Sequence, residues 1–130
     1  MRPSSPTIRV VLSNKHTMFR DGIKALFRQT GIEIVGEAVT AQQTLMLVQG
    51  LRPDVVLLDA TMPNLSCSET TRRIKAAAPQ VEVLILSLDD DAQLIANCLR
   101  AGAAGYIRRD DAPQQVLRTI TAACRRVHAA

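Results

Sequence analysis

The sequence of 130 residues has very few aromatic side chains, with two Phe, one Tyr and no Trp. Proteins that bind single-stranded nucleic acids stack the bases on aromatic side chains above a basic groove. The net charge of +4 does not provide such a groove, because the basic residues are dispersed and their densest clusters are pairs, such as Arg72-Arg73 and Arg125-Arg126. Zinc-finger spacing and RNA-binding aromatic motifs are also missing. We therefore expect no direct binding of nucleic acid.

Long apolar runs and paired cysteines are missing as well. No run approaches the roughly 18 residues that span a membrane, and the polar start of the chain shows no signal-type apolar segment. The three cysteines, Cys67, Cys98 and Cys124, are odd in number, lie within apolar patterns, and are too far apart in sequence to indicate a ligand pair. We expect a cytoplasmic protein with three reduced thiols and no membrane partner.

Nucleotide-binding and nucleophilic motifs are missing too. There is no G-x-G-x-x-G segment and no phosphate-binding loop, and Ser13 has no adjacent histidine–carboxylate signature. We expect no cofactor, no metal and no catalytic residue, and we do not expect an enzyme.

What the sequence does contain is an alternation of strand-like and helical patterns within a length that suits one domain. The expected strands are Ile8–Leu12, Ile32–Gly36, Val55–Leu58, Val81–Leu86 and Tyr106–Ile107. Between them, apolar residues recur at helical spacing. This alternation predicts right-handed crossovers and a parallel sheet with helices on both faces. We predict a flavodoxin-like (βα)5 doubly wound fold with strand order 2-1-3-4-5.

Glycines and apolar stripes set the expected helix limits. Gly31 should end the first helix, and Gly102 should end the fourth, whose inner stripe should include Leu94, Ile95, Cys98 and Leu99. Cys67 to Ala77 should form the third helix. The last helix should bury Val116, Ile120, Ala123 and Val127.

In doubly wound sheets, binding groups gather at the carboxyl ends of the strands. Asp59 directly follows the apolar run Val55–Leu58, where a carboxylate could form an acyl phosphate. Taken alone, Asp59 could equally be a residue that ends a strand.

The sequence around Asp59 resembles the response-regulator receiver domains of the NarL/FixJ type. The matching segments, in order along the chain, are Ile8-Arg9-Val10-Val11-Leu12, His16, Phe19-Arg20-Asp21-Gly22, Val35-Gly36-Glu37-Ala38, residues 52–59, Met62-Pro63 and residues 100–106. The resemblance implies a receiver domain over residues 8–127, between a flexible N-terminus (1–7) and a short tail (128–130). It also implies that Asp59 is the phospho-acceptor position, Ser87 the switch hydroxyl and Tyr106 the switch aromatic residue.

Three other site positions depart from the family pattern. Asn14 and Lys15 replace the acidic pair that holds Mg²⁺ in the family, and Arg109 replaces its lysine. If ionised, Asp59, Lys15 and Arg109 sum to about +1, whereas three carboxylates and a lysine would give about −2. We therefore predict that metal-dependent phosphorylation is absent or very slow. Either Lys15 or Arg109 forms a permanent ion pair with Asp59, or the site has decayed and Asp59 remains for packing.

Two neighbouring features have plainer interpretations. The run Asp89-Asp90-Asp91 could be a displaced metal site, but its position before a helix favours compensation of the helix dipole. His16 is expected beside the site without a catalytic role, and His128 is expected in the disordered tail.

Together, these features predict an atypical, phosphorylation-independent receiver domain that controls the dimerisation and activity of a bacterial transcriptional regulator. The resemblance implies an attached helix-turn-helix DNA-binding domain, which this chain does not contain, and a homodimer. The alternative is a conventional receiver that a histidine kinase or a small phosphodonor phosphorylates at Asp59. A small flavin- or nucleotide-binding enzyme on the same fold is disfavoured by the missing phosphate loop.

Overall fold

The computed structural model describes residues 7–87 and 91–128, with side chains to residue 124. The strands are β1 (Ile8–Ser13), β2 (Ile32–Ala38), β3 (Val55–Asp59), β4 (Glu82–Ser87) and β5 (Gly105–Arg108). The helices are α1 (Thr17–Phe27), α2 (Ala41–Leu51), α3 (Cys67–Ala77), α4 (Ala92–Arg100) and α5 (Pro113–His128). Most of the predicted flexible N-terminus, residues 1–6, lies outside the described residues.

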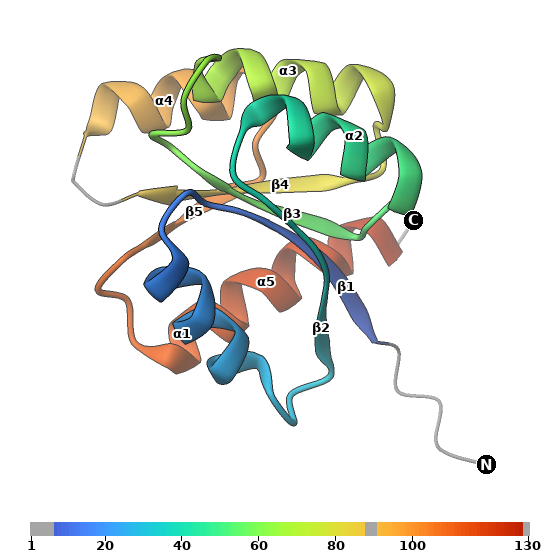
Figure 1. The fold of residues 1–130 in the computed structure, drawn as a ribbon, viewed down its shortest axis with the longest axis vertical. Coiled ribbons are helices and arrows are strands. Elements are labelled where there is room, and N and C mark those ends of the chain that lie inside the picture. The colour runs from blue at the N-terminus through green and yellow to red at the C-terminus, as the bar shows by residue number, and fades with distance from the viewer. Residues whose placement is uncertain (1–6, 88–90, 129–130) are drawn as a thin grey trace.

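The five strands form one parallel sheet in the order β2-β1-β3-β4-β5. Helices α1 and α5 cover one face of the sheet, and α2, α3 and α4 cover the other (Figure 1). The predicted doubly wound fold and its strand order are confirmed.

Alternating residues of the central strands build two separate cores. Val10, Leu12 and Leu57 pack toward α1 and α5, whereas Val11 and Leu58 pack toward the three helices on the other face. Consecutive strand side chains point to opposite faces of a sheet, so a strand covered on both sides is apolar throughout. The continuous apolar run before Asp59 is therefore what holds β3, and with it Asp59, in the middle of the sheet.

Several predicted limits of the elements are wrong. Helix α1 ends at Phe27, four residues before Gly31, and a turn containing Gln29 and Gly31 at positive φ leads into β2. Leu99 is 41% exposed, because α4 packs through Ile95 and Cys98. His128, predicted to lie in the tail, is the last residue of α5.

Among the described residues, no helix combines the length and the apolar character needed to cross a membrane.

Candidate functional site

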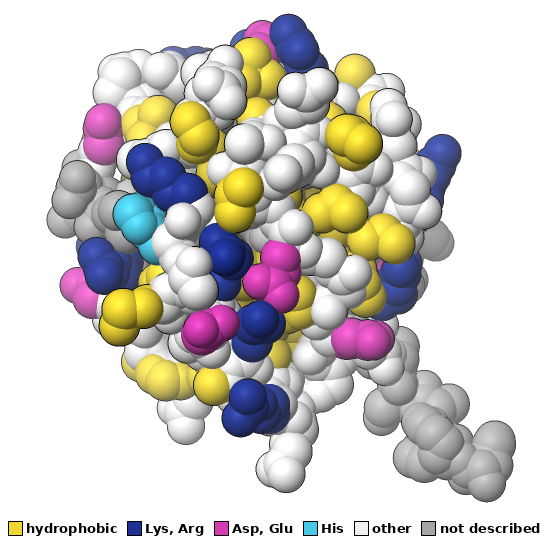
Figure 2. All heavy atoms as spheres, viewed as in Figure 1, with side chains coloured by type: hydrophobic (Ala, Val, Ile, Leu, Met, Phe, Trp, Pro, Cys, Tyr) yellow, Lys and Arg dark blue, Asp and Glu magenta, His cyan; other side chains and the backbone are white. Residues whose placement is uncertain are grey.

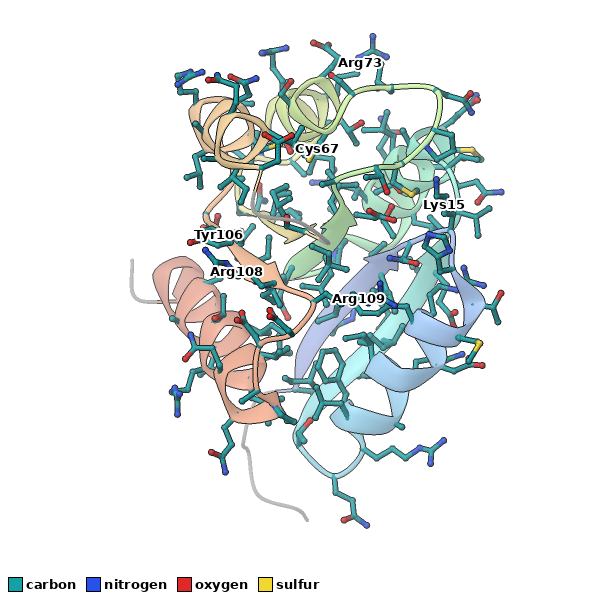
Figure 3. All side chains as sticks on the ribbon, turned by 90° about the vertical axis from the view of Figure 1, so that its left-hand side faces the viewer. Lys15, Cys67, Arg73, Tyr106, Arg108 and Arg109 are labelled. Carbon is teal, nitrogen blue, oxygen red and sulfur yellow. The ribbon has the colours of Figure 1, made fainter. Side chains whose placement is uncertain are left out.

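The register of the sheet brings the predicted site residues to one edge. Ser13 pairs with Leu58, Asp59 with Leu86, and Ser87 with Arg108. The carboxyl ends of β1, β3, β4 and β5 therefore lie together, and Figure 3 views this edge. Asn14 follows Ser13 directly, as Asp59 follows Leu58, so these two residues come next to each other on neighbouring strands.

Asp59 is a buried carboxylate that is only half satisfied. Asp59 is only 1% exposed to solvent. Oδ1 accepts hydrogen bonds from the backbone N–H and the hydroxyl of Thr61, each at 2.9 Å, whereas Oδ2 is buried and has no hydrogen-bond partner among residues 7–87 and 91–124. An unpaired buried carboxylate oxygen costs free energy, so Asp59 is not explained by packing alone.

Asn14 is also buried, and its oxygens are already engaged. Its side-chain Oδ1 accepts from the backbone N–H of His16 at 2.7 Å. Its backbone carbonyl accepts from the guanidinium of Arg20 at 2.6 Å, and Arg20 in turn contacts Glu37 at 3.2 Å. Arg20 therefore fixes the loop after β1, a role that sequence reasoning missed although Phe19-Arg20-Asp21-Gly22 was among the resembling segments.

Of the two alternatives for Asp59, the ion pair with Lys15 or Arg109 is contradicted by the structure. Within the described ranges, no basic side chain forms a salt bridge with Asp59. Lys15 and Arg109 are both exposed. Figure 3 shows them well separated, with Arg109 beside α1 and Lys15 toward α2. The loops after β1 and β5 therefore leave both cations on the surface and outside salt-bridge distance of Asp59.

The residues at this edge do not fit the Mg²⁺ ion that the resemblance implies. Mg²⁺ prefers oxygen ligands in near-octahedral geometry. Asp59 offers one free oxygen, the side-chain oxygen of Asn14 is occupied, and Lys15 brings an ammonium group. Among the described residues, no group of three His, Cys, Asp or Glu side chains could hold a metal ion.

The two predicted switch residues lie on adjacent strands. Ser87 is 3% exposed at the end of β4, whereas Tyr106 of β5 is 39% exposed. The Arg108 guanidinium lies 6.0 Å from the centre of the Tyr106 ring, within cation–π range. Their joint movement remains a prediction.

The acidic run before α4 can be placed in part. Asp91 is the N-cap residue of α4, and its carboxylate accepts from the backbone N–H of Leu94 at 3.0 Å. This is the predicted helix-terminus role. Asp89 and Asp90 lie outside the described residues.

The three cysteines are free thiols, and all three are buried. Sequence distance was misleading here, because Cys67 of α3 and Cys98 of α4 share a side-chain hydrogen bond. That bond raises the pKa of the Cys67 thiol, with burial as the second cause, and lowers the pKa of Cys98. Burial, and next the carboxylate of Asp54, raises the pKa of Cys124.

The raised pKa of Cys124 predicts a pH dependence of stability. Above the unfolded thiol pKa of about 8.5, the unfolded chain loses a proton that the folded chain keeps, so the free energy of unfolding falls as pH rises. A single thiol can contribute a slope of at most about 1.4 kcal/mol per pH unit. Urea unfolding at pH 8 and 9.5 should show a shallower decline for Cys124→Ala than for the unsubstituted chain. Equal slopes would contradict the prediction.

Residues 10–121 match the family model of the response regulator receiver domain. The chain belongs to this family. It is 33% identical over 119 residues to the uncharacterized transcriptional regulatory protein YxjL of Bacillus subtilis, covering 91% of this chain and 55% of that protein. It is 34% identical over 114 residues to the response regulator UvrY of Escherichia coli, covering 87% of this chain and 52% of that protein.

Solved structures agree with the sequence relatives. The signal receiver domain of the putative response regulator NarL from Mycobacterium tuberculosis superimposes with a TM-score of 0.86 at 27% identity, covering 92% of this chain and 98% of that one. The receiver domain spans about half the length of the curated relatives it matches. The predicted resemblance to NarL-type receivers is confirmed.

Proposed function

We propose that this receiver domain works without phosphorylation and controls the dimerisation and activity of a bacterial transcriptional regulator. The observation that carries the proposal is the pair Asn14–Lys15 beside Asp59. A carboxylate that accepts a phosphoryl group from a donor needs a metal ion and cationic groups placed to neutralise the developing charge. Here the side-chain oxygen of Asn14 is committed to the backbone N–H of His16, and Lys15, which is exposed, supplies no carboxylate to the site.

The replacement of the family's lysine by Arg109 also supports a function without phosphorylation. A lysine presents a compact ammonium, whereas the planar guanidinium of Arg109 has a different shape and reach. Arg109 lies beside α1 (Figure 3), and it forms no salt bridge with Asp59 in the part of the chain that the structure describes. The geometry therefore favours a site that neither collects Mg²⁺ nor aims a cation at the acceptor oxygen.

The partners in this proposal follow from the relatives and from the surface. YxjL is named as a transcriptional regulatory protein, so we infer that this domain belongs to a cytoplasmic regulator with a helix-turn-helix DNA-binding domain, acts as a homodimer, and needs no histidine kinase. On the face drawn in Figure 2, basic side chains alternate with acidic and apolar ones. Such a mixed surface favours protein contacts over direct contact with nucleic acid, and no enzymatic activity is proposed.

One observation favours the alternative of a conventional phospho-acceptor. The Oδ2 atom of Asp59 has no hydrogen-bond partner among the residues that the structure describes, so these residues leave it available to a phosphoryl group. Ser87 and Tyr106 also occupy the strands where a phosphate-driven switch would need them. The two functions differ in their response to Mg²⁺ and a phosphate mimic.

The test is an NMR titration of the ¹⁵N-labelled chain with millimolar Mg²⁺ and then beryllofluoride, followed by sedimentation velocity. We expect no localised shifts at Asp59, Ser87 or Tyr106, and a dimer fraction set by protein concentration alone. Saturable shifts at these residues, together with a beryllofluoride-dependent dimer, would overturn the proposal and establish the conventional switch. The control is Asp59→Asn, which should have the same dimer fraction as the unsubstituted chain.

A further inference from the structure

A pocket opens beside the strand ends, between α1 and the loop that follows β5. Its volume is about 630 Å³, within the range of about 300–1,000 Å³ typical of small-molecule sites. It is lined by Asn14, His16, Met18, Phe19, Gly22, Ile23 and Arg109.

The lining has an apolar part and a polar part. Ile23 is buried, Phe19 is half-buried, and Met18 is 88% exposed at the rim, so these three form a wall for a hydrocarbon or an aromatic ring. Asn14, His16 and Arg109 supply the polar groups of the lining, and none of the residues that line the pocket is acidic. An apolar wall with a cation in the same lining matches a ligand with an apolar body and a negative charge.

The Arg109 guanidinium has the donors for such a charge. In the part of the chain that the structure describes, no hydrogen bond or ion pair engages this side chain; only its backbone N–H is bonded, to the carbonyl of Ser87 at 3.0 Å. The acidic Glu37 nearby on β2 is already paired with Arg20 at 3.2 Å and with Lys24 at 3.0 Å. Five N–H donors in a planar fork suit a carboxylate or a sulfonate.

Gly22 keeps the pocket open. It lies inside α1, where glycine is a poor helix former, and a Cβ placed on it would meet no heavy atom within 4 Å. Because Gly22 also lines the pocket, a side chain at this position would start in open space beside the other lining residues.

We propose that this pocket binds a small organic anion with an apolar body. The anionic group lies on Arg109, and the apolar body lies along Phe19 and Ile23 in the space left by Gly22. The proposal goes beyond phosphorylation independence and holds whether or not Asp59 accepts phosphate. Because the loop of Asn14 forms part of the lining, an occupied pocket would also touch the edge of the sheet that holds Asp59.

The experiment is a fluorescence titration of the whole chain with 8-anilinonaphthalene-1-sulfonate, an aromatic anion, and with its uncharged analogue N-phenyl-1-naphthylamine. We expect the sulfonate to bind one saturable site. Gly22→Leu should weaken its binding at least tenfold. The matched control is Gly50→Leu, at another helical glycine whose Cβ would also meet nothing within 4 Å, and it should change binding less than twofold.

A second variant tests the charge without filling the pocket. Arg109→Met should weaken binding of the sulfonate about fivefold or more and leave binding of the uncharged analogue within twofold. Chemical shifts on adding the sulfonate should map to Phe19, Gly22 and Ile23, at protein concentrations where the chain is monomeric.

Three results would overturn the proposal. The first is that Gly22→Leu binds the sulfonate as tightly as the unsubstituted chain does. The second is that Arg109→Met loses affinity equally for the sulfonate and for its uncharged analogue. The third is that the fluorescence of the bound sulfonate falls as the chain dimerises and neither variant changes it. The last result would assign the exposed rim at Met18 to contact with a second copy of the chain. Mg²⁺ is absent from these titrations, so their outcome does not depend on the phosphorylation test.

Discussion

Replacing Asn14 and Lys15 with aspartate and Arg109 with lysine is expected to raise the affinity of this edge of the sheet for Mg²⁺. The three changes convert a site with a net charge of about +1 into one of about −2. Each added carboxylate contributes oxygen ligands at the edge where Oδ2 of Asp59 has no partner among the described residues, and removal of the ammonium removes repulsion from the metal. Isothermal titration should show affinity for Mg²⁺ at least about tenfold higher in the triple variant, a difference of ~1.4 kcal/mol.

The backbone of this chain is already arranged for that result. Asn14 and Asp59 follow the paired residues Ser13 and Leu58 on adjacent strands, and Arg20 holds the carbonyl of Asn14 in place. The substitutions therefore change ligands and charge, not the positions from which the ligands come. Restored metal binding should also restore a response to beryllofluoride.

A matched control separates the local effect from total charge. Arg72→Asp combined with Arg73→Gln lowers the net charge by the same amount on the exposed face of α3, where both arginines pair with Glu69. This control should leave Mg²⁺ binding undetectable. If the control binds as well as the triple variant, or if the triple variant binds nothing, the three positions do not account for the loss of the metal site.

The sequence predicted the layers and the strand order because the relevant signals are local. An apolar run such as Val55–Leu58 fixes a doubly covered strand, and the order of strands and helices leaves few parallel topologies. The sequence pattern therefore predicted the position of Asp59 at the end of β3 correctly. The C-terminal limit of α1 and the exposure of Leu99 were predicted incorrectly. The first depends on the turn that forms after the helix, and the second depends on which side chains α4 packs against the sheet.

The parts of the site that were missed all depend on contacts between distant segments. The hydrogen bond between Cys67 and Cys98 joins two helices, and the contact of Arg20 with the Asn14 carbonyl depends on how α1 leaves the sheet. The ion-pair alternative for Asp59 failed for the same reason, because it also depends on how segments distant in the sequence are arranged. Charge arithmetic gives the sum of Lys15, Asp59 and Arg109, but not the directions in which two loops carry the cations.

The substitution Asp59→Asn is expected to stabilise the fold, by about 1 to 2 kcal/mol at pH 7. It keeps the size of the side chain and the acceptor for the two Thr61 donors, while it removes a charge that is 1% exposed and forms no salt bridge among the described residues. Asp59→Ala should gain less, because it leaves the N–H and the hydroxyl of Thr61 without their acceptor. Urea unfolding with linear extrapolation measures each difference.

The same substitution at a satisfied carboxylate is the control. The carboxylate of Asp54 accepts a hydrogen bond from the backbone N–H of Arg9 at 2.9 Å, at the other end of β3, so Asp54→Asn should not increase the free energy of unfolding.

A second control is Lys15→Ala, which should leave the free energy of unfolding unchanged, since Lys15 is exposed and does not contact Asp59. If Asp59→Asn destabilises the chain as much as Asp54→Asn does, the carboxylate is compensated in solution. If Lys15→Ala is also destabilising, Lys15 is the compensating cation and the rejected ion pair forms after all. A gain only at Asp59 would mean that the domain keeps this carboxylate at the expense of its own stability, which packing alone does not require.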